Sequence, residues 1–432
     1  MNEITLGTAL LFGLLVLFML VRIPIAFSLG ISSLFTAMYL NIPFFNLFQK
    51  MATGLTSFTF MCVPFFIIMA QIMTEGGISD KLTQFCNVLV GRMRGGTAMV
   101  NIIVSMFFGG ISGSSIADVS SIGAFLIPAM EKEGYDKGYS VAVTVTSSVQ
   151  GIIIPPSQNM IFYCVASASG ISISTMFIAG YLPGILLGLS LMIPAYIIAV
   201  KRRYPISTKK SFRENAIIIR ESLLGLFTIL IIIFGITFGI FTATESAAVA
   251  AMYALLLTVF VYRTLTFKKF IHVLFASLKP LATVMAIIAT SSAFSYILSY
   301  LRVPARVAGS FLALTSNPLL IMLMINILLL ILGCFMDMGI LILLLTPILF
   351  PVATGIGYDP YHFGIVMILN LGIGLCTPPV GTSLFAGCAI ANLPIEKAIK
   401  DFFPFYGGMI VLLAIIIIFP QICLWLPELL AN

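Results

Sequence analysis

Two short segments of the chain place glycine, serine and aspartate inside otherwise apolar sequence. The first is GGISGSSIAD, residues 109–118, and the second is GCFMDMG, residues 333–339. Glycine permits sharp turns and close approach of two backbones. The carbonyl and hydroxyl oxygens that such a turn frees are hard ligands, suited to a small alkali cation, while the N-termini of half-helices there can instead attract an anion. The alternative is that the small residues only pack helices together.

Each segment carries one acid, Asp118 or Asp337. An aspartate in the hydrocarbon region costs about 2.5–3.5 kcal/mol on insertion scales, so it usually has a partner or a role. One such role is to cap the second helix of a hairpin by accepting backbone N–H bonds, and capping is compatible with ion binding. We predict that both acids bind or support a cation; at Asp118 the choice between ion ligand and helix cap stays open.

A Pro-Pro pair follows each acid, and polar residues follow each pair. The sequences are PPSQN at 155–159 and PPVGTS at 378–383. Proline removes a backbone donor and clashes with a preceding carbonyl, so two in succession unwind a helix and free carbonyl oxygens. A simple kink is the alternative, but broken helices at matching places in two halves indicate a transport site. The candidate substrate-binding residues are Pro155, Ser157, Gln158, Asn159, Thr382 and Ser383.

The two sites are predicted to differ in polarity. Upstream of the first break the chain has five polar residues, and the matching stretch of the second half has Asn370 and little else; the five are Thr144, Thr146, Ser147, Ser148 and Gln150. We therefore expect the first site to be more polar and closer to the substrate.

These features recur in order along the chain, which predicts an internal repeat. Asp118 and Asp337 are each followed ten residues later by a proline, Pro128 or Pro347, and then by a Gly-Tyr-Asp triplet, at 134–136 or 357–359. The offset is 219 residues between the acids (118 and 337) and 223 between the Pro-Pro pairs (155 and 378). We interpret the difference as a four-residue insertion.

The elements that must position these groups are predicted to be membrane helices, because stretches of about 20 apolar residues can cross a bilayer. The first half, 1–200, is predicted to have full spans near 4–23, 24–43, 57–75 and 173–200, a re-entrant hairpin near 97–130 and a span broken at Pro-Pro near 137–168. The second half, 221–432, is predicted to have spans near 221–242, 244–262, 274–297 and 405–427, a hairpin near 317–352 and a broken span near 361–391. We interpret Glu245 as an N-terminal helix charge, with Thr242 or Thr244 as the cap.

Five crossings in each half is an odd number, so the two halves are predicted to be inverted relative to each other. Residues 201–220 join them and hold seven of the 22 Lys and Arg residues, which places this linker in the cytoplasm by the positive-inside rule. The topology puts 18 Lys and Arg residues inside and Lys50, Arg302 and Arg306 outside, with both termini periplasmic.

The composition favours a membrane protein and excludes other classes. The chain is 60% hydrophobic and 9% charged, which a soluble core and surface cannot accommodate. The net charge of +7 comes from short loops and does not indicate nucleic-acid binding. No GxxxxGK[ST] loop is present, so an ion gradient or a partner must drive transport. No Cys or His spacing predicts a transition-metal site.

Four segments strongly resemble the large membrane subunit of TRAP transporters (tripartite ATP-independent periplasmic, DctM-like): GGISGSSIADVSSIGAFLIPAMEKEGYD, IIIPPSQNMI, GCFMDMGILILLLTPILFP and GLCTPPVGTSLF. The resemblance covers essentially the whole chain. It implies a sodium-driven importer of organic acids, such as C4-dicarboxylates or sialic acid, in the bacterial inner membrane, with Na⁺ as the coupling ion and no other cofactor. It also implies two partners, a small membrane subunit (DctQ-like) not fused to this chain and a periplasmic substrate-binding protein (DctP-like).

The same resemblance implies an elevator mechanism, in which a transport domain slides along a fixed scaffold. The scaffold would come from 1–75 and 221–262, and the transport domain from 97–168 and 317–391. Sodium sites of the family lie at the hairpin tips and the unwound breaks. This carries over to Ser112, Gly113, Ser114 and Ser115 at the first tip, and to Gly333, Asp337, Thr377, Pro378 and Gly381 in the second half.

Three other functions are weighed against this one. A stand-alone sodium- or proton-coupled symporter of related elevator type would need no binding protein. A channel would need a continuous pore rather than paired broken helices. An intramembrane protease would need a Ser/His or Asp pair in a catalytic context, which the sequence around Asp118 and Asp337 lacks.

Overall fold

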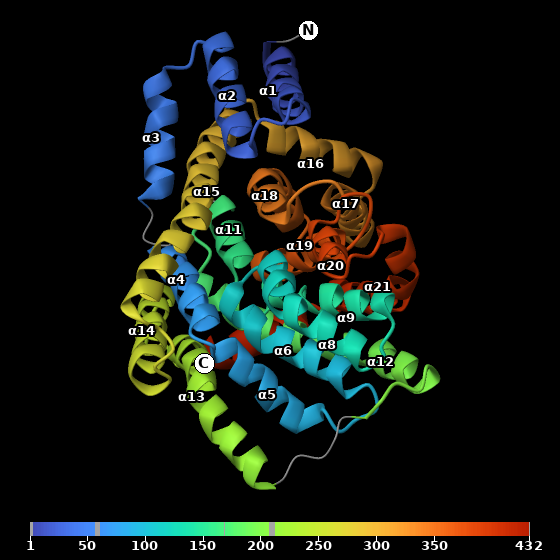
Figure 1. The fold of residues 1–432 in the computed structure, drawn as a ribbon. Coiled ribbons are helices and arrows are strands. Elements are labelled where there is room, and N and C mark those ends of the chain that lie inside the picture. The colour runs from blue at the N-terminus through green and yellow to red at the C-terminus, as the bar shows by residue number, and fades with distance from the viewer. Residues whose placement is uncertain (1–2, 57–60, 168, 207–211, 432) are drawn as a thin grey trace.

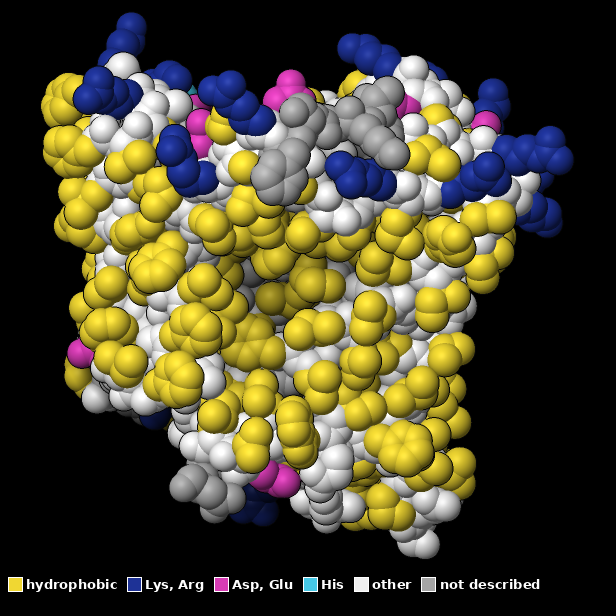
Figure 2. All heavy atoms as spheres, turned by 90° about the horizontal axis from the view of Figure 1, so that it is seen from below, with side chains coloured by type: hydrophobic (Ala, Val, Ile, Leu, Met, Phe, Trp, Pro, Cys, Tyr) yellow, Lys and Arg dark blue, Asp and Glu magenta, His cyan; other side chains and the backbone are white. Residues whose placement is uncertain are grey.

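The computed structural model describes residues 3–56, 61–167, 169–206 and 212–431. In these ranges the chain forms helices and no strand (Figure 1). Seven of the described helices are long and apolar enough to cross a membrane. Figure 2 shows apolar side chains in a broad band across one face of the molecule, with Lys and Arg side chains gathered along one edge of that band. The predicted all-helical membrane fold is confirmed.

The membrane-length helices agree with most of the predicted spans. They are α1 (Glu3–Leu20), α12 (Ile173–Lys201), α13 (Phe212–Thr237), α14 (Ala243–Leu256) with its extension η3 (Leu257–Val261), α15 (Phe267–Tyr300), α18 (Met338–Gly355) and α21 (Ile395–Ile418). The helix α2 (Ile25–Tyr39) is shorter. The start of α14 is capped as predicted, since Glu245 N–H donates to Thr242 Oγ1 at 3.3 Å and Thr242 N–H donates to Glu245 Oε2 at 2.8 Å.

Several predicted spans have different bounds in the structure. The helix α13 starts at Phe212, inside the predicted linker 201–220, and α15 starts at Phe267, before the predicted residue 274. The span near 57–75 starts in residues outside the described ranges, and its helix α4 (Cys62–Glu75) is followed after a 69° bend by α5 (Ile78–Val90). Gly77 at the bend has φ +74°, a conformation that favours glycine. The span near 405–427 is wrong: α21 starts ten residues earlier, at Ile395, and ends at Ile418, before Pro420 and α22 (Gln421–Ala431). A proline there cannot continue the backbone hydrogen bonds.

Both predicted hairpins form as pairs of helices joined at a tip, and their re-entry into the membrane stays a prediction. In the first, α6 (Gly96–Ser112) is followed by α7 (Ser115–Asp118), η2 (Val119–Gly123) and α8 (Ala124–Lys132). The helix α6 ends where Gly113 adopts φ +62°, and Ser114 caps α7 by accepting from Ala117 N–H at 3.4 Å. In the second, α17 (Pro318–Gly333) precedes α18, and Asp337 caps α18 by accepting from Gly339 N–H at 3.0 Å.

Both predicted helix breaks are also present. In the first half α9 (Lys137–Ser147) and α10 (Gln150–Ile153) precede the break, and α11 (Gln158–Ala166) follows it. In the second half α19 (Pro360–Leu375) precedes the break and α20 (Thr382–Ile390) follows it. The Pro155-Pro156 and Pro378-Pro379 bonds are both cis. The predicted end of the first broken span, residue 168, lies outside the described residues.

The structure corrects the register of the internal repeat. The two hairpin caps, Ser114 and Asp337, are 223 residues apart (114 and 337), as are the Pro-Pro pairs (155 and 378). Gly134 and Gly357, with φ +91° and +93°, keep the same offset (134 and 357). With this offset Asp118 does not match Asp337, and Pro128 matches Pro351 rather than Pro347. The predicted four-residue insertion is wrong. Ser114 and Asp337 have the same capping role although they are different residue types.

The packing repeats with the sequence. The first arm of each hairpin crosses a broken helix of its own half at a pair of glycines, Gly109 with Gly151 and Gly333 with Gly374. The second arm packs on its own half, α18 on α19 and α8 on α9, and also on the other half, α18 on α11 and η2 on α20. Each half therefore packs on a hairpin of the other half.

The helix α15 contacts both the N-terminal helices and the helices of the hairpins and breaks. It packs against α2, α3 (Phe44–Leu55) and α4, and it also contacts α18, α11 and α16 (Val303–Leu314). On another side of the molecule, Arg202 pairs with Asp136 Oδ2 at 2.8 Å and with Asp401 Oδ1 at 2.6 Å, which ties the ends of α12, α9 and α21 together. Residues 207–211 of the predicted linker lie outside the described ranges.

Candidate functional site

A cavity of about 180 Å³ lies where the two hairpin tips meet the first Pro-Pro break and α15. The first tip contributes Gly113, Ser114 and Ser115, and the second contributes Asp337 to Ile340. The polar side chains of α11 and α15 in the wall are Gln158, Asn159 and Thr283. The cavity thus combines hydroxyl, amide and carboxylate groups from both halves of the chain.

The first tip is held against the break by close backbone contacts. A Cβ atom on Gly113 would lie 3.0 Å from the backbone nitrogen of Gln158, so glycine allows this approach. Asn159 Nδ2 donates to the Gly113 carbonyl at 3.4 Å. Ser112 turns inward, where its hydroxyl donates to the Ser114 carbonyl at 3.3 Å. Pro155 packs behind the same tip, with its carbonyl oxygen facing Gly110.

Ser115 joins three elements of the two halves. Its hydroxyl is 2.5 Å from Ser148 Oγ, at the end of α9, and 2.7 Å from Ser383 Oγ, at the start of α20. Ser115 is buried and also lines the cavity. A hydroxyl has one donor and two acceptor positions, so this cluster can share protons among its members and offer an oxygen to a ligand.

Asp337 brings a carboxylate to the cavity wall. Its Oδ1 atom accepts from Gly339 N–H at 3.0 Å at the start of α18. No Lys, Arg or His pairs with it in the part of the chain that the structure describes. Because a carboxylate in an apolar setting needs compensation, its remaining oxygen positions fit a cation from outside the protein.

The second break forms a compact group beside the cavity. Cys334 O accepts from Val380 N–H at 3.0 Å and from Gly381 N–H at 3.4 Å. Thr377 Oγ1 donates to Ile373 O at 2.7 Å, and Tyr406 OH donates to Cys376 O. At the first break Ser157 Oγ likewise donates to Ile152 O at 2.6 Å. Several carbonyl oxygens near the breaks are therefore already bound by the protein, unlike the free carbonyls expected from the sequence.

Asp118 lies behind the first tip and not in the cavity wall. It is 1% exposed, and neither carboxylate oxygen has a hydrogen-bond partner among the described residues. It does not cap the second arm of the hairpin, because Ser114 takes that place. The capping alternative is thus wrong for Asp118 and correct for Asp337. An ion role for either acid stays a prediction.

The cavity brings together six of the sixteen predicted site residues: Gly113, Ser114, Ser115, Gln158, Asn159 and Asp337. Six others gather at the second break and reach the cavity through the Ser115–Ser383 contact: Gly333, Thr377, Pro378, Gly381, Thr382 and Ser383. Thr382 has a buried hydroxyl with no hydrogen-bond partner among the described residues. Ser112, Pro155 and Ser157 support the backbone, and Asp118 is buried apart.

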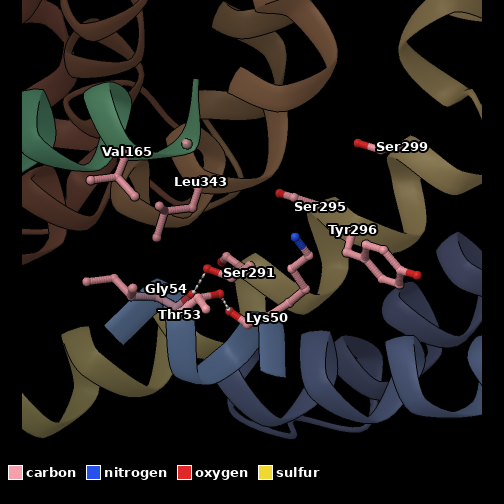
Figure 3. Close-up of a pocket in the computed structure, with 12 residues that line it drawn as sticks. Lys50, Thr53, Gly54, Val165, Ser291, Ser295, Tyr296, Ser299 and Leu343 are labelled. Carbon is pink, nitrogen blue, oxygen red and sulfur yellow. Dashed lines mark hydrogen bonds between the residues drawn. The ribbon is translucent and has the colours of Figure 1, made fainter. Parts of the chain in front are cut away.

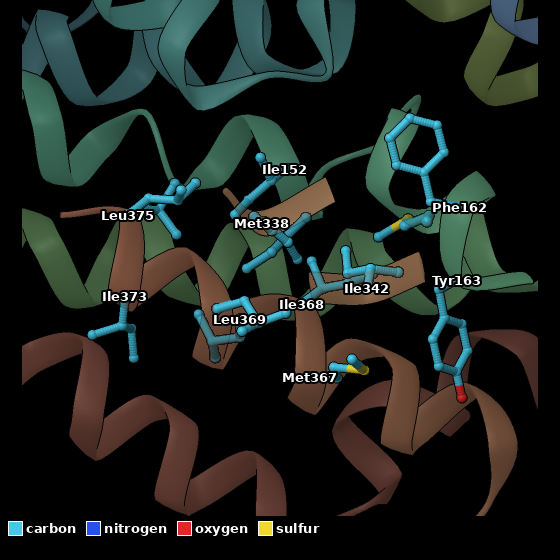
Figure 4. Packing of buried hydrophobic residues seen from close by; sticks show 14 of the residues in the cluster. Ile152, Phe162, Tyr163, Met338, Ile342, Met367, Ile368, Leu369, Ile373 and Leu375 are labelled. Atoms are coloured by element: carbon cyan, nitrogen blue, oxygen red, sulfur yellow. The ribbon is translucent and has the colours of Figure 1, made fainter. Parts of the chain in front are cut away.

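The sequence analysis missed the apolar part of the wall and the whole contribution of α15. Figure 4 shows Ile152, Phe162, Met338 and Leu375 in the packed core, and all four also line the cavity. Thr283, Val284 and Ile287 of α15 face it from the other side. Nothing in the apolar sequence of α15 distinguishes these three positions from their neighbours, so only the fold could identify them.

The chain matches a known family over nearly its full length. The family model is described as "Tripartite ATP-independent periplasmic transporter, DctM component" and matches residues 12–422. The chain is 38% identical to the sialic acid TRAP transporter large permease protein SiaM of Vibrio cholerae, covering 94% of this chain and 95% of that protein. It is also 38% identical to the C4-dicarboxylate TRAP transporter large permease protein DctM of Pseudomonas aeruginosa, covering 86% of each.

Solved structures with a similar fold are transporters of low sequence identity. The YdaH transporter of Alcanivorax borkumensis superposes with a TM-score of 0.66 at 12% identity, covering 86% of this chain and 87% of that one. MtrF of Neisseria gonorrhoeae, which represents a class of antimetabolite efflux pumps, gives a TM-score of 0.59 at 11% identity, covering 88% of this chain and 84% of that one. These likenesses concern the fold alone.

Proposed function

Because the chain belongs to the family of DctM components of tripartite ATP-independent periplasmic transporters, we propose that it is a large permease subunit that imports an organic acid and uses Na⁺ as the coupling ion. The observation that carries the proposal is the cavity in which both hairpin tips meet, with the Asp337 carboxylate and the Ser114 and Ser115 hydroxyls in its wall. A permease of this family is a transporter and not an enzyme.

The oxygen groups of the cavity support Na⁺ as the coupling ion. Asp337 offers a carboxylate that no basic side chain pairs with in the described ranges. Ser114 and Ser115 add hydroxyl oxygens, and Gly113 adds a carbonyl. Hard oxygen ligands of this kind suit Na⁺. We assign the first sodium site to the tip at Ser112–Ser115 and the second to Asp337 with the neighbouring break at Thr377–Gly381.

The relatives and the polar side chains of α11 support the proposed substrate class. The relatives named above carry C4-dicarboxylates and sialic acid, and both are carboxylates. In this chain Gln158 and Asn159 face the cavity with amide groups that can donate to a carboxylate, while the sodium ions balance its charge. We therefore propose an organic acid of either type as the cargo.

The arrangement of the helices supports an elevator mechanism in the bacterial inner membrane. The hairpins and broken helices pack on one another, and α15 contacts α18 and α11 as well as α2 and α3. The helices α4 and α5 also contact α6 of the first hairpin directly. We propose that 97–168 and 317–391 move as the transport domain against a scaffold of 1–75 and 221–262, extended by α15. In this proposal the two halves are inverted and both termini are periplasmic.

Two partners follow from the tripartite family, a small DctQ-like membrane subunit and a DctP-like periplasmic binding protein that delivers the acid. The relevant experiment reconstitutes the chain with both partners in proteoliposomes and measures uptake of radiolabelled succinate and N-acetylneuraminate. We expect uptake of one acid that needs an inward Na⁺ gradient and the binding protein. Sodium-driven uptake without the binding protein would favour a stand-alone symporter, and uptake without Na⁺ would contradict the coupling.

A further inference from the structure

A second cavity, of about 460 Å³, lies along α15 (Figure 3). Its polar wall is made by Lys50 and Thr53 of α3 and by a row of serines on α15. Val165 of α11 and Leu343 of α18 face them; we call the hairpins and the broken helices together the hairpin group. Leu343 lines both cavities, and the α15 residues Ile287 and Ile288 are neighbours that line one cavity each. The two spaces are therefore adjacent.

The outer cavity contains a cationic group that no acid neutralises. Lys50 extends from α3 toward the segment of α15 that carries Ser295 and Tyr296 (Figure 3). Its Nζ atom lies 5.9 Å from the centroid of the Tyr296 ring, and it forms no ion pair within the described residues. An unpaired ammonium group beside hydroxyl side chains is a recognition element for an anion.

A buried hydroxyl in the same wall also lacks a partner. Ser291 is 6% exposed, and its Oγ atom has no hydrogen-bond partner in the described part of the chain. The neighbouring Ser292 differs, because its Oγ atom donates to Ile288 O at 2.9 Å. A buried polar group left unpaired costs stability, and a ligand in this cavity would supply the missing partner.

The two cavities follow one another along a single helix. Thr283 and Ile287 line the inner cavity, whereas Ser291 to Ser299 line the outer one. At 1.5 Å per residue the path from Thr283 to Ser299 is about 24 Å long. The charge distribution of the sequence places Lys50 and the C-terminal end of α15 toward the periplasm. An anion that reaches Lys50 would thus be guided along α15 to the hairpin tips.

We propose that Lys50, Ser291 and the adjacent serines of α15 form an outer binding site for the carboxylate of the organic acid, ahead of the inner cavity. The ammonium group of Lys50 binds a carboxylate oxygen, and the Ser291 and Ser295 hydroxyls bind the other oxygens of the acid. The inference rests on the proposed function. It assigns part of the substrate affinity to helices of the proposed scaffold and not to the hairpins.

The test measures initial rates of sodium-driven uptake of radiolabelled succinate or N-acetylneuraminate, whichever the wild type carries, with both partners present. Lys50→Gln is expected to raise the half-saturating concentration of the acid about tenfold, while Lys50→Arg stays within about twofold of wild type. The maximal rate and the half-saturating Na⁺ concentration should not change, because Lys50 does not line the inner cavity. Lys279→Gln is the matched control, since Lys279 is an exposed lysine of α15 that lines neither cavity.

Ser291→Ala gives an independent variant that should fold normally, because the hydroxyl it removes has no partner in the described protein. We expect it to raise the half-saturating concentration of the acid about threefold or more. Ser277→Ala is its control, a buried serine of α15 outside both cavities. Unchanged half-saturation in both Lys50→Gln and Ser291→Ala would overturn the outer site, and so would an equal effect of Lys279→Gln.

The outcomes also separate this inference from the proposed function. If the wild type shows sodium-driven uptake and the Lys50 and Ser291 variants behave like the wild type, only the outer site is overturned. Wild-type protein that carries neither acid under a Na⁺ gradient would overturn the proposed function and the outer site with it. A Lys50→Gln effect that disappears in vesicles without anionic lipid would assign Lys50 to a headgroup and overturn its role toward the acid.

Discussion

At the scale of single residues, capping and charge are separate properties of the same side chain. Ser114 and Asp337 hold corresponding places in the two hairpins and both accept a backbone N–H bond. Only an acid adds a formal charge to that role. The second tip is therefore the one that can bind a cation strongly by charge, while the first binds through hydroxyl and carbonyl oxygens.

Replacing Asp337 by Asn should separate its two roles. Asparagine caps helices about as well as aspartate, so the hairpin should keep its fold, but the charge is lost. We expect the half-saturating Na⁺ concentration for uptake to rise roughly tenfold or more, which corresponds to about 1.4 kcal/mol. Asp359→Asn is the control, because Asp359 caps α19 through Tyr361 and His362 N–H groups outside the cavity. An unchanged Na⁺ dependence in Asp337→Asn would show that Asp337 caps α18 and does not bind Na⁺.

The Ser115–Ser383 contact should be visible as an energetic coupling between the two halves. Thermal unfolding of Ser115→Ala, Ser383→Ala and the double variant in detergent forms a double-mutant cycle. Because the two hydroxyls are 2.7 Å apart and buried, we expect a coupling energy of about 0.5–3 kcal/mol. Additive effects within error would show that the two hydroxyls do not stabilise each other.

At the scale of elements, the sequence was sufficient for the hairpins and the breaks and insufficient for their register. Glycine turns and Pro-Pro pairs act locally, so 97–130, 317–352 and both broken helices could be predicted. The alignment of Asp118 with Asp337 failed because the repeat preserves a capping role and not a residue type. The bend at Gly77 and the wall residues of α15 depend on contacts between distant segments, which local patterns do not contain.

The glycine crossings of the two halves should tolerate no side chain. A Cβ atom on Gly374 would lie 2.6 Å from the carbonyl carbon of Gly333, and one on Gly151 would lie 2.8 Å from the Cα atom of Gly109. We expect Gly374→Ala to lower the free energy of unfolding by about 1–3 kcal/mol through overpacking, measured as a lower melting temperature in detergent. Gly355→Ala is the control, since no atom lies within 4 Å of its added Cβ. Equal melting temperatures for Gly374→Ala and wild type would contradict a tight crossing.

At the scale of the whole molecule, α15 contacts both the proposed scaffold and the proposed transport domain, as α4 does through α6. The proposed motion would change these contacts. The helix α15 packs on α2, α3 and α4 and touches α18 and α11. Both cavities have α15 as one wall and the hairpin group as the other. An acid that moves with the hairpins would thus leave the α15 wall behind.

A covalent link between α15 and the hairpin group should therefore stop transport. We would place cysteines at Ile287 and Leu343, which line the same cavity, in a Cys334→Ser background, and join them with a short bifunctional maleimide. The expected result is loss of most uptake on cross-linking, with full uptake before it, because the cavity can no longer leave α15.

The control links two helices that the elevator proposal holds together. A Cβ atom on Gly30 of α2 would lie 3.8 Å from Thr290 Cβ of α15, which is the usual Cβ separation in a disulfide. The Gly30→Cys, Thr290→Cys pair should oxidise and leave uptake intact. Normal uptake with the Ile287–Leu343 link in place would rule out a sliding transport domain.

The contact between Ser115 and Ser383 also has a consequence for biosynthesis. The two residues are 268 positions apart in the chain, so at typical synthesis rates of 5–20 residues per second the ribosome needs about 13 to 54 seconds to supply the partner of the first tip. During that interval the tip has its own break but not the helix α20 that completes it. The first half must therefore wait in the translocation machinery or the lipid with an unfinished site.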